Sequence, residues 1–222
     1  MVPCAWRLPA ERKDLVIAIV DYGMGNLRSV EKALLRIGQS VQVTREPAVI
    51  RAADGVVLPG VGAFRACMAN LDRFGLVPIV RDVIEGGKPF LGICLGMQIL
   101  FSESEEFGPV SGLGVLPGRV VRFGGESVAG LRVPHMGWNQ PCRRGDTPVL
   151  AGVEEGAYAY FVHSYYVVPE DPEIITTETP YGVRFASSVA RDNIFACQFH
   201  PEKSQEIGLR MLANFGAVVA RG

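Results

Sequence analysis

Cys94 lies between two glycines in the stretch Gly92-Ile93-Cys94-Leu95-Gly96, a G-x-C-x-G arrangement. The apolar residues 90–93 predict a short buried strand, and the pattern from Leu95 onward predicts a helix. A sharp strand-to-helix turn of this kind pushes a reactive side chain out of the sheet, and it needs glycines where side chains would collide. The helix N-terminus would also favour a thiolate. A buried structural cysteine is a common alternative, but the two glycines favour a nucleophile.

A base for this nucleophile is available in Phe199-His200-Pro201-Glu202. His200 follows an apolar stretch that predicts a strand, so it should emerge at that strand's carboxyl end, the edge where ligand sites of α/β sheets form and where Cys94 is also expected. Glu202 can accept a hydrogen bond from the imidazole and hold its tautomer. Alone, His200 would be interpreted as a structural histidine. With Cys94 and Glu202, the pattern predicts a catalytic triad.

Two glycine-rich turns follow predicted strands. Backbone amides of Pro59-Gly60-Val61-Gly62, together with the amide of Leu95, are placed to form an oxyanion hole, although an ordinary glycine turn is the alternative. The turn Asp21-Tyr22-Gly23-Met24-Gly25-Asn26 lacks the third glycine of a dinucleotide-binding fingerprint. We therefore interpret it as a tight turn between a strand and a helix.

These motifs together resemble a known family. Gly92-x-Cys94-x-Gly96-Met97-Gln98 and His200-Pro201-Glu202 resemble the class I (triad) glutamine amidotransferases. The stretches 58–64 and Pro134-His135-Met136-Gly137-Trp138-Asn139 resemble one branch, the glutaminase subunits of imidazole glycerol phosphate synthase in histidine biosynthesis. The resemblance runs from about Val16 to the C-terminal helix.

The resemblance implies an activity and a partner. The activity is hydrolysis of L-glutamine to glutamate and ammonia, with no metal or organic cofactor. The partner, in a heterodimer, is a (β/α)8-barrel cyclase subunit that uses the ammonia to make imidazole glycerol phosphate and the aminoimidazole carboxamide ribotide. The residues expected against glutamine are Gln98, His163 and Ser164, and those expected at the partner interface are Asn26, Met136, Trp138, Tyr160 and Lys203.

The elements that must position these residues predict a single-domain α/β fold. The expected architecture is a flavodoxin-like open, mostly parallel sheet with flanking helices and an added set of short antiparallel strands. Strands are predicted at 15–20, 41–44, 55–58, 90–93, 159–166, 174–177 and 187–191, and helices at 27–37, 63–71, 76–85 and 206–219. Residues 102–106 are expected to form an acidic turn, and 108–118 and 134–139 are expected to be loops. Alternation in 159–166 places Phe161 and His163 on one face.

Composition excludes several classes of protein. A net charge of -1 over 222 residues gives no electrostatic basis for binding nucleic acid or a membrane surface. Five cysteines without C-x-x-C pairs indicate neither a disulfide framework nor a zinc site, and reduced thiols fit the cytoplasm. No apolar run approaches transmembrane length. Residues 1–14 are expected to be a polar leader before a glutamine amidotransferase domain at 15–222. Whether they are a disordered tail, a real addition or sequence upstream of the true start is left open.

Three alternatives remain at this stage. A cysteine-elbow hydrolase or DJ-1-like protein would share the sheet, but a histidine with Glu at plus two after a late strand suits amidotransferases better. A catalytically silent protein would lack a triad residue, and Cys94, His200 and Glu202 are all present. Anthranilate-type and pyridoxal-type glutaminases are disfavoured by the two branch stretches.

Overall fold

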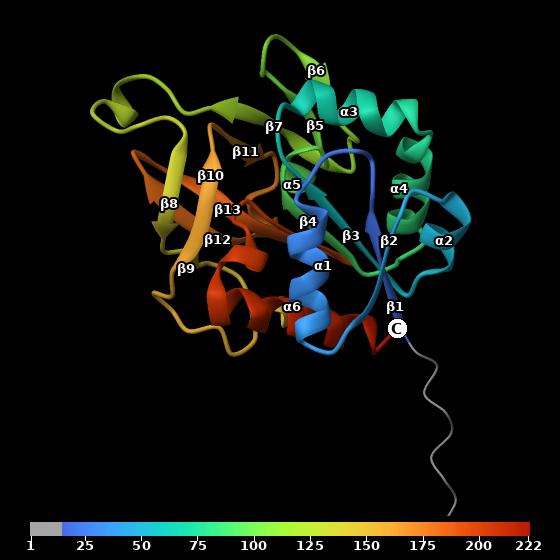
Figure 1. The fold of residues 1–222 in the computed structure, drawn as a ribbon. Helices are drawn as coiled ribbons and strands as arrows, with labels where there is room; N and C mark the ends of the chain where they lie inside the picture. Colours follow the sequence, from blue (N-terminus) through green and yellow to red (C-terminus); the bar gives the residue numbers. More distant parts are fainter. Residues whose placement is uncertain (1–14) are drawn as a thin grey trace, which may run out of the picture.

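The computed structural model describes residues 15–222, and one large sheet runs through it (Figure 1). The expectation for residues 1–14 lies outside the described residues. The parallel part of the sheet has the strand order β2-β1-β3-β4-β14. Because β4 is parallel to both β3 and β14, the carboxyl ends of these three strands meet at one edge. The bounds are β1 (Val16–Val20), β2 (Ser40–Thr44), β3 (Gly55–Gly60), β4 (Phe90–Cys94) and β14 (Ile194–Cys197).

Antiparallel strands extend the sheet beyond β14, in the order β13-β11-β7, before β5 and β6 complete that end. Strand β12 pairs with β13 and with β9, while β8 and β10 form a separate two-stranded sheet. The mixed α/β architecture predicted from the sequence is therefore confirmed. The bounds are β5 (Phe101–Ser104), β6 (Val110–Ser111), β7 (Leu116–Arg122), β8 (His135–Asn139), β9 (Cys142–Arg143), β10 (Ala159–His163), β11 (Tyr165–Pro169), β12 (Ile175–Tyr181) and β13 (Val183–Arg191).

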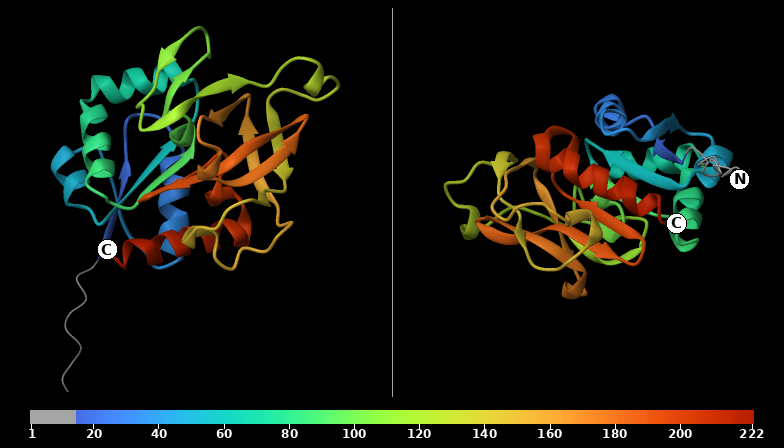
Figure 2. Two further views of the ribbon diagram at one scale, coloured as in Figure 1. Left: turned by 180° about the vertical axis from the view of Figure 1, so that it is seen from behind. Right: turned by 90° about the horizontal axis from the view of Figure 1, so that it is seen from below.

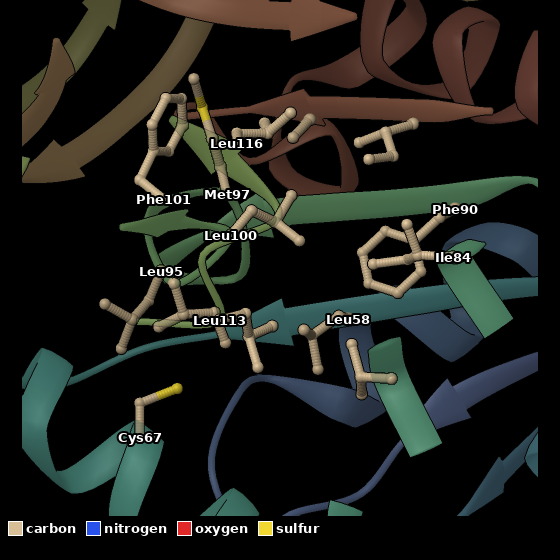
Figure 3. Close-up of a cluster of buried hydrophobic side chains, with 14 of the residues drawn as sticks. Leu58, Cys67, Ile84, Phe90, Leu95, Met97, Leu100, Phe101, Leu113 and Leu116 are labelled. Atoms are coloured by element: carbon tan, nitrogen blue, oxygen red, sulfur yellow. The ribbon is translucent and has the colours of Figure 1, made fainter. Parts of the chain in front are cut away.

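Helices cover both faces of the parallel strands because side chains alternate between the faces. On one face, Ile17, Ile19 and Ile93 pack in a core with residues of α1 and α6. On the other, Val56 and Leu58 pack with residues of α2, α3 and α4, part of which is drawn in Figure 3. The bounds are α1 (Leu27–Arg36), α2 (Pro47–Ala52), α3 (Phe64–Arg73), α4 (Leu76–Glu85) and α6 (Gln205–Val219).

The added strands lie at one side of the molecule. Figures 1 and 2 show β8 and β10 on the opposite side from α2 and α4. Single 3₁₀ turns occur at η1 (Glu126–Val128), η2 (Pro148–Leu150), η3 (Pro172–Ile174) and η4 (Pro201–Lys203). Within residues 15–222, no helix is both long enough and apolar enough to cross a membrane.

The helix predicted from Leu95 onward is shorter than expected. Helix α5 (Leu95–Gln98) is one turn, and the chain passes at once into β5. Leu95, Ile99 and Leu100 imitate a helical stripe only because all are buried in one core. The stretch predicted as an acidic turn therefore begins as strand, and the stretch predicted as loop at 108–118 contains β6 and the start of β7. One turn of helix has few aligned peptides, so its dipole contributes little to stabilising a thiolate.

Two further elements differ from prediction. The stretch 134–139, expected to be a loop, contains strand β8, which pairs antiparallel with β10 and sets His135 opposite His163. The stretch 159–166, expected to be one strand, breaks at Ser164, after which β11 joins the large sheet. Phe161 and His163 do share the buried face, as the alternation predicted. Ser164, at this break, lines the same cleft as Cys94, which ends β4.

Candidate active site

Cys94 ends β4 in a conformation that ordinary residues avoid. Its φ of 55° and ψ of −110° mark the sharp turn between β4 and α5. A Cβ on Gly96 would lie 1.8 Å from the carbonyl oxygen of Leu58, and one on Gly92 would lie 2.8 Å from the carbonyl oxygen of Gly96. Gly96 is therefore required for the turn to pack against β3, and Gly92 for β4 to pack against α5.

His200 and Glu202 form a buried pair next to this turn. His200 Nδ1 is 2.8 Å from Glu202 Oε1, and both side chains are almost inaccessible to solvent. The backbone N–H of His200 donates to Tyr160 O, and Ser204 Oγ donates to His200 O, so strand β10 and η4 hold the imidazole in place. Its Nε2 forms no hydrogen bond with any described residue and is the atom left for Cys94.

The electrostatics of the pair favour a charged imidazole. Burial alone would lower the pKa of His200, but the interactions with Cys94 and Glu202 outweigh it and raise the pKa to about 10. An imidazolium near the sulfur stabilises the thiolate, which is the nucleophilic form of cysteine. The site therefore combines a cysteine with a charged histidine that a carboxylate orients.

Cys94 and His200 open into a cleft of ≈ 520 Å³. The predicted residues Val61, Gly62, Leu95, Gln98, His163 and Ser164 line it as well. Glu202 lies behind His200, and Gly60 lies directly beside Cys94 in the β3–β4 register. The remaining lining residues are Glu106, Phe107, Arg122, Pro134, Val162 and Tyr165.

The strand end at 59–62 approaches the elbow closely. A Cβ on Gly60 would lie 2.8 Å from the backbone N of Gly96 and from Tyr22 Oη, so no larger residue fits. Gly62 has a φ of 96°, which favours glycine. Leu95 begins α5, so helical hydrogen bonding leaves its N–H unused. Gly62 and Leu95 line the cleft into which Cys94 opens, and Gly60 lies beside Cys94 in the sheet.

Comparisons with known proteins show which family the chain belongs to. The family model for class-I glutamine amidotransferases matches residues 18–218. The HisH subunit of imidazole glycerol phosphate synthase from Syntrophotalea carbinolica is 57% identical over 205 residues, covering 90% of this chain and 99% of that protein.

The chain belongs to the class-I glutamine amidotransferases, in their HisH branch.

A second HisH subunit supports this assignment, and a solved structure shows the same fold. The HisH subunit from Moorella thermoacetica is 56% identical over 203 residues, covering 91% of this chain and 95% of that protein. The structure of PurLQS from Thermotoga maritima superposes with a TM-score of 0.70 at 19% identity, covering 94% of this chain and 99% of that one, which shows the shared fold. This amidotransferase is thus the glutaminase subunit type that its sequence motifs predicted.

In this amidotransferase, the wall residue His163 belongs to a buried histidine pair. His163 Nδ1 lies 2.8 Å from Tyr165 O, which only accepts, so Nδ1 carries a proton. His163 Nε2 lies 2.9 Å from His135 Nδ1, and Asn139 Nδ2 lies 3.2 Å from His135 Nε2. Two neutral imidazoles satisfy this chain, with each Nδ1 donating. Burial lowers the pKa of His135 to about 4 and that of His163 to about 3.

Four of the predicted interface residues lie together on one face of the amidotransferase, here called the docking face after the role proposed for it below. Met136 and Trp138 share the outer side of β8 and are 63% and 45% exposed, so Trp138 is not a core residue. Trp138 contacts the ring of Tyr160 at 5.9 Å between centroids, and Lys203 Nζ lies 5.6 Å from the same ring. The fifth, Asn26, caps the start of α1, a helix that contacts η4.

Sequence reasoning missed several residues of the site. Glu106 and Arg122 line the cleft, but the acidic residues at 102–106 resembled a solvated turn because no local pattern reveals that β5 runs beside β7. Gln198, next to the triad in sequence, reaches Cys94, and Ser204 clamps the His200 segment. The polar residues that flank His200-Pro201-Glu202 were the available signal. Within residues 15–222, no group of three metal-ligating side chains is close enough to hold an ion.

Proposed function

We propose that Cys94, His200 and Glu202 hydrolyse L-glutamine to glutamate and ammonia through a glutamyl thioester. The observation that carries this proposal is the shared cleft: Cys94 on its strained turn and the Nε2 of a Glu202-bound His200 open into one space. Cys94 Sγ attacks the carboxamide carbon to form a tetrahedral intermediate. His200 Nε2–H then protonates the departing nitrogen, which leaves as ammonia.

The second half of the reaction reverses these roles. Neutral His200 takes a proton from water, the resulting hydroxide attacks the thioester carbon, and the C–S bond breaks to release glutamate. The sulfur leaves as a thiolate and His200 is again an imidazolium. Throughout, Glu202 Oε1 accepts from Nδ1–H and stabilises the charged ring without transferring a proton.

The negative oxygen of each tetrahedral intermediate needs backbone donors. The proposed oxyanion hole comprises the N–H of Leu95 and amides of Gly60, Val61 and Gly62, because Gly60 lies opposite Cys94 and the other three line the cleft. Such preorganised donors contribute most where water is excluded.

The ends of the substrate find complementary charges in the cleft. Glu106 suits the α-ammonium group of glutamine and Arg122 suits its α-carboxylate. His163 has both ring nitrogens engaged and Ser164 O accepts from Phe123 N–H, so the N–H and hydroxyl of Ser164 are the groups proposed to meet glutamine. Gln98 uses its Nε2 internally and offers only Oε1.

The docking face is the proposed contact with a (β/α)8-barrel cyclase subunit, which would receive the ammonia. The relatives' names describe subunits of imidazole glycerol phosphate synthase, and such a subunit needs a partner. Exposed Met136 and Trp138 give the apolar and aromatic character expected of an interface centre, and Lys203 beside the Tyr160 ring would belong to its polar rim. Tyr160 lies 6.5 Å from the His200 ring, so docking occurs next to the triad.

A glutaminase assay with and without the cyclase subunit and its nucleotide substrate tests the proposal. We expect stimulation of glutamate release by the liganded partner, and no glutamate release from Cys94→Ala under either condition. The Cys94→Ala complex should still form product when ammonia is supplied, because the acceptor chemistry belongs to the partner. Glutaminase activity retained in Cys94→Ala would overturn the nucleophile assignment. A wild-type rate that the liganded cyclase subunit does not increase would overturn the partner assignment.

A further inference from the structure

Two buried glutamine side chains lie directly behind the nucleophile. Gln98 is 5% exposed and Gln198 is fully buried, although each carries an amide that must find hydrogen-bond partners. Gln98 Nε2 lies 3.0 Å from Tyr165 O and 2.8 Å from Gln198 Oε1. Gln198 Nε2 in turn lies 3.5 Å from Cys94 Sγ, a distance suited to a hydrogen bond to sulfur. We call this chain of groups the amide relay.

The direction of the amide relay is fixed at one end. The oxygen and nitrogen of an amide have similar shapes, so its orientation must be set by its partners. Tyr165 O is a backbone carbonyl and can only accept, so Gln98 must turn its NH₂ group toward it. The second N–H of that group points at Gln198, which must therefore present its oxygen. The NH₂ group of Gln198 is left facing the sulfur.

We infer that Gln198 is a catalytic residue whose N–H stabilises the thiolate of Cys94, with Gln98 as the positioning residue that aims it. The relay contains only neutral groups, so it supports the negative sulfur without competing with Glu202 for the proton of His200. This inference rests on the proposed function, because it assigns a further residue to the same reaction.

The donor acts at two points of the reaction. Before attack it stabilises the thiolate, and during thioester hydrolysis it stabilises the sulfur as leaving group. At that second point His200 carries the proton taken from water, and the N–H of Gln198 supplies a second donor to the departing sulfur. Gln198 does not line the cleft, so it acts on the sulfur and not on bound glutamine.

Alkylation of Cys94 by iodoacetamide, followed by peptide mass spectrometry across pH 5–9, tests the inference on the full chain. Gln198→Met removes the N–H at similar length. Gln198→Glu keeps the volume and an oxygen toward Gln98, and changes only the group that faces sulfur. Gln140→Met is the control, since Gln140 Nε2 donates to Gly156 O away from the cleft.

In Gln198→Met, we expect the pH of half-maximal Cys94 alkylation to rise by about one unit, as for loss of a hydrogen bond to a charged group. Glutaminase kcat should fall about tenfold to a hundredfold with KM nearly unchanged. Gln198→Glu should be alkylated more slowly at pH 8 than Gln198→Met, because a carboxylate then faces the sulfur. The control should match the wild type in both assays.

An alkylation profile and a kcat equal to those of the wild type in both Gln198 variants would overturn the inference. If only the melting temperature of these variants were lowered, Gln198 would be a packing residue and the inference would be wrong. Should Gln198→Met lose its melting transition, Gln198→Glu decides by itself. The alkylation assay needs neither glutamine nor the partner. Failure here is therefore distinct from failure of the proposed function, which would appear as glutaminase activity in Cys94→Ala.

Discussion

The buried pair of His135 and His163 should make the protein sensitive to acid. Both rings are packed among aromatic side chains, with the His135 ring 4.0 Å from Tyr181 and the His163 ring 5.1 Å from Phe185 between centroids. The chain of hydrogen bonds from Asn139 to Tyr165 O satisfies both rings only in the neutral form. Protonation of either ring would leave two donors facing each other or a donor without an acceptor.

The size of the effect follows from the lowered pKa values. In the unfolded chain each histidine has a pKa of about 6.5, whereas burial lowers the pKa to about 4 for His135 and about 3 for His163. Stability from a lowered histidine pKa is therefore present above pH 6.5 and lost as pH falls below it. At pH 5.0, about 1.5 units below the unfolded value, each neutral imidazole costs about 2 kcal/mol of unfolding free energy.

Urea unfolding of wild type and His135→Gln at pH 8.0 and pH 5.0 measures this cost. Glutamine can still accept from Asn139 and donate to His163, but it does not titrate. We expect the loss of stability between the two pH values to be about 2 kcal/mol smaller in the variant. His200, whose raised pKa adds stability as pH falls, is present in both proteins, so its contribution cancels. Equal losses in the two proteins would refute the assignment of a neutral His135.

Three further predictions concern the turn, the triad and the docking face. Gly96→Ala should destabilise by about 3 kcal/mol in urea unfolding, because its Cβ would lie 1.8 Å from Leu58 O. Gly124→Ala, whose added Cβ would meet no atom within 4 Å, should change stability little, and comparable stability of the two variants would contradict the elbow geometry. Glu202→Gln should keep more glutaminase activity than His200→Ala, since loss of the base lowers the rate by about 10²–10⁴-fold. Near-normal rates in both variants with saturating partner would place the base elsewhere. Trp138→Ala should lower partner-stimulated turnover more than basal turnover. The lost contact with Tyr160 should reduce the free energy of unfolding by about 0.5–1.5 kcal/mol. A much larger loss of stability with normal stimulation would contradict the interface role of Trp138.

Local chemistry in the sequence was enough to predict the turn at Cys94. The glycines on either side of the cysteine reflect collisions with atoms of β3 and α5 that any side chain would make. Alternation in β10 likewise placed His163 on the buried face. The glycine spacing and the strand's period of two are each visible within a few neighbouring residues, which is why they were predictable, although Leu58 itself is distant in sequence.

Features that depend on distant pairing were not predictable. The end of helix α5 after one turn could not be predicted, because its four residues are all buried and no polar face marks its length. The pair His135–His163 joins residues 28 positions apart, and the Gln98–Gln198 contact joins residues 100 apart. A periodic pattern carries no information about such register, so Glu106 and Gln198 were recognised only in the folded chain.

The central claim is that Cys94 is the nucleophile of a glutamine-binding cleft. A diazoketone analogue of glutamine, which alkylates a thiolate only when held beside it, tests this directly by peptide mass spectrometry of the inactivated protein. The account predicts one added label, on the peptide containing Cys94, with labelling suppressed by excess glutamine. Labelling of Cys142 instead, the more exposed thiol, or labelling of Cys94 that glutamine does not suppress, would contradict it.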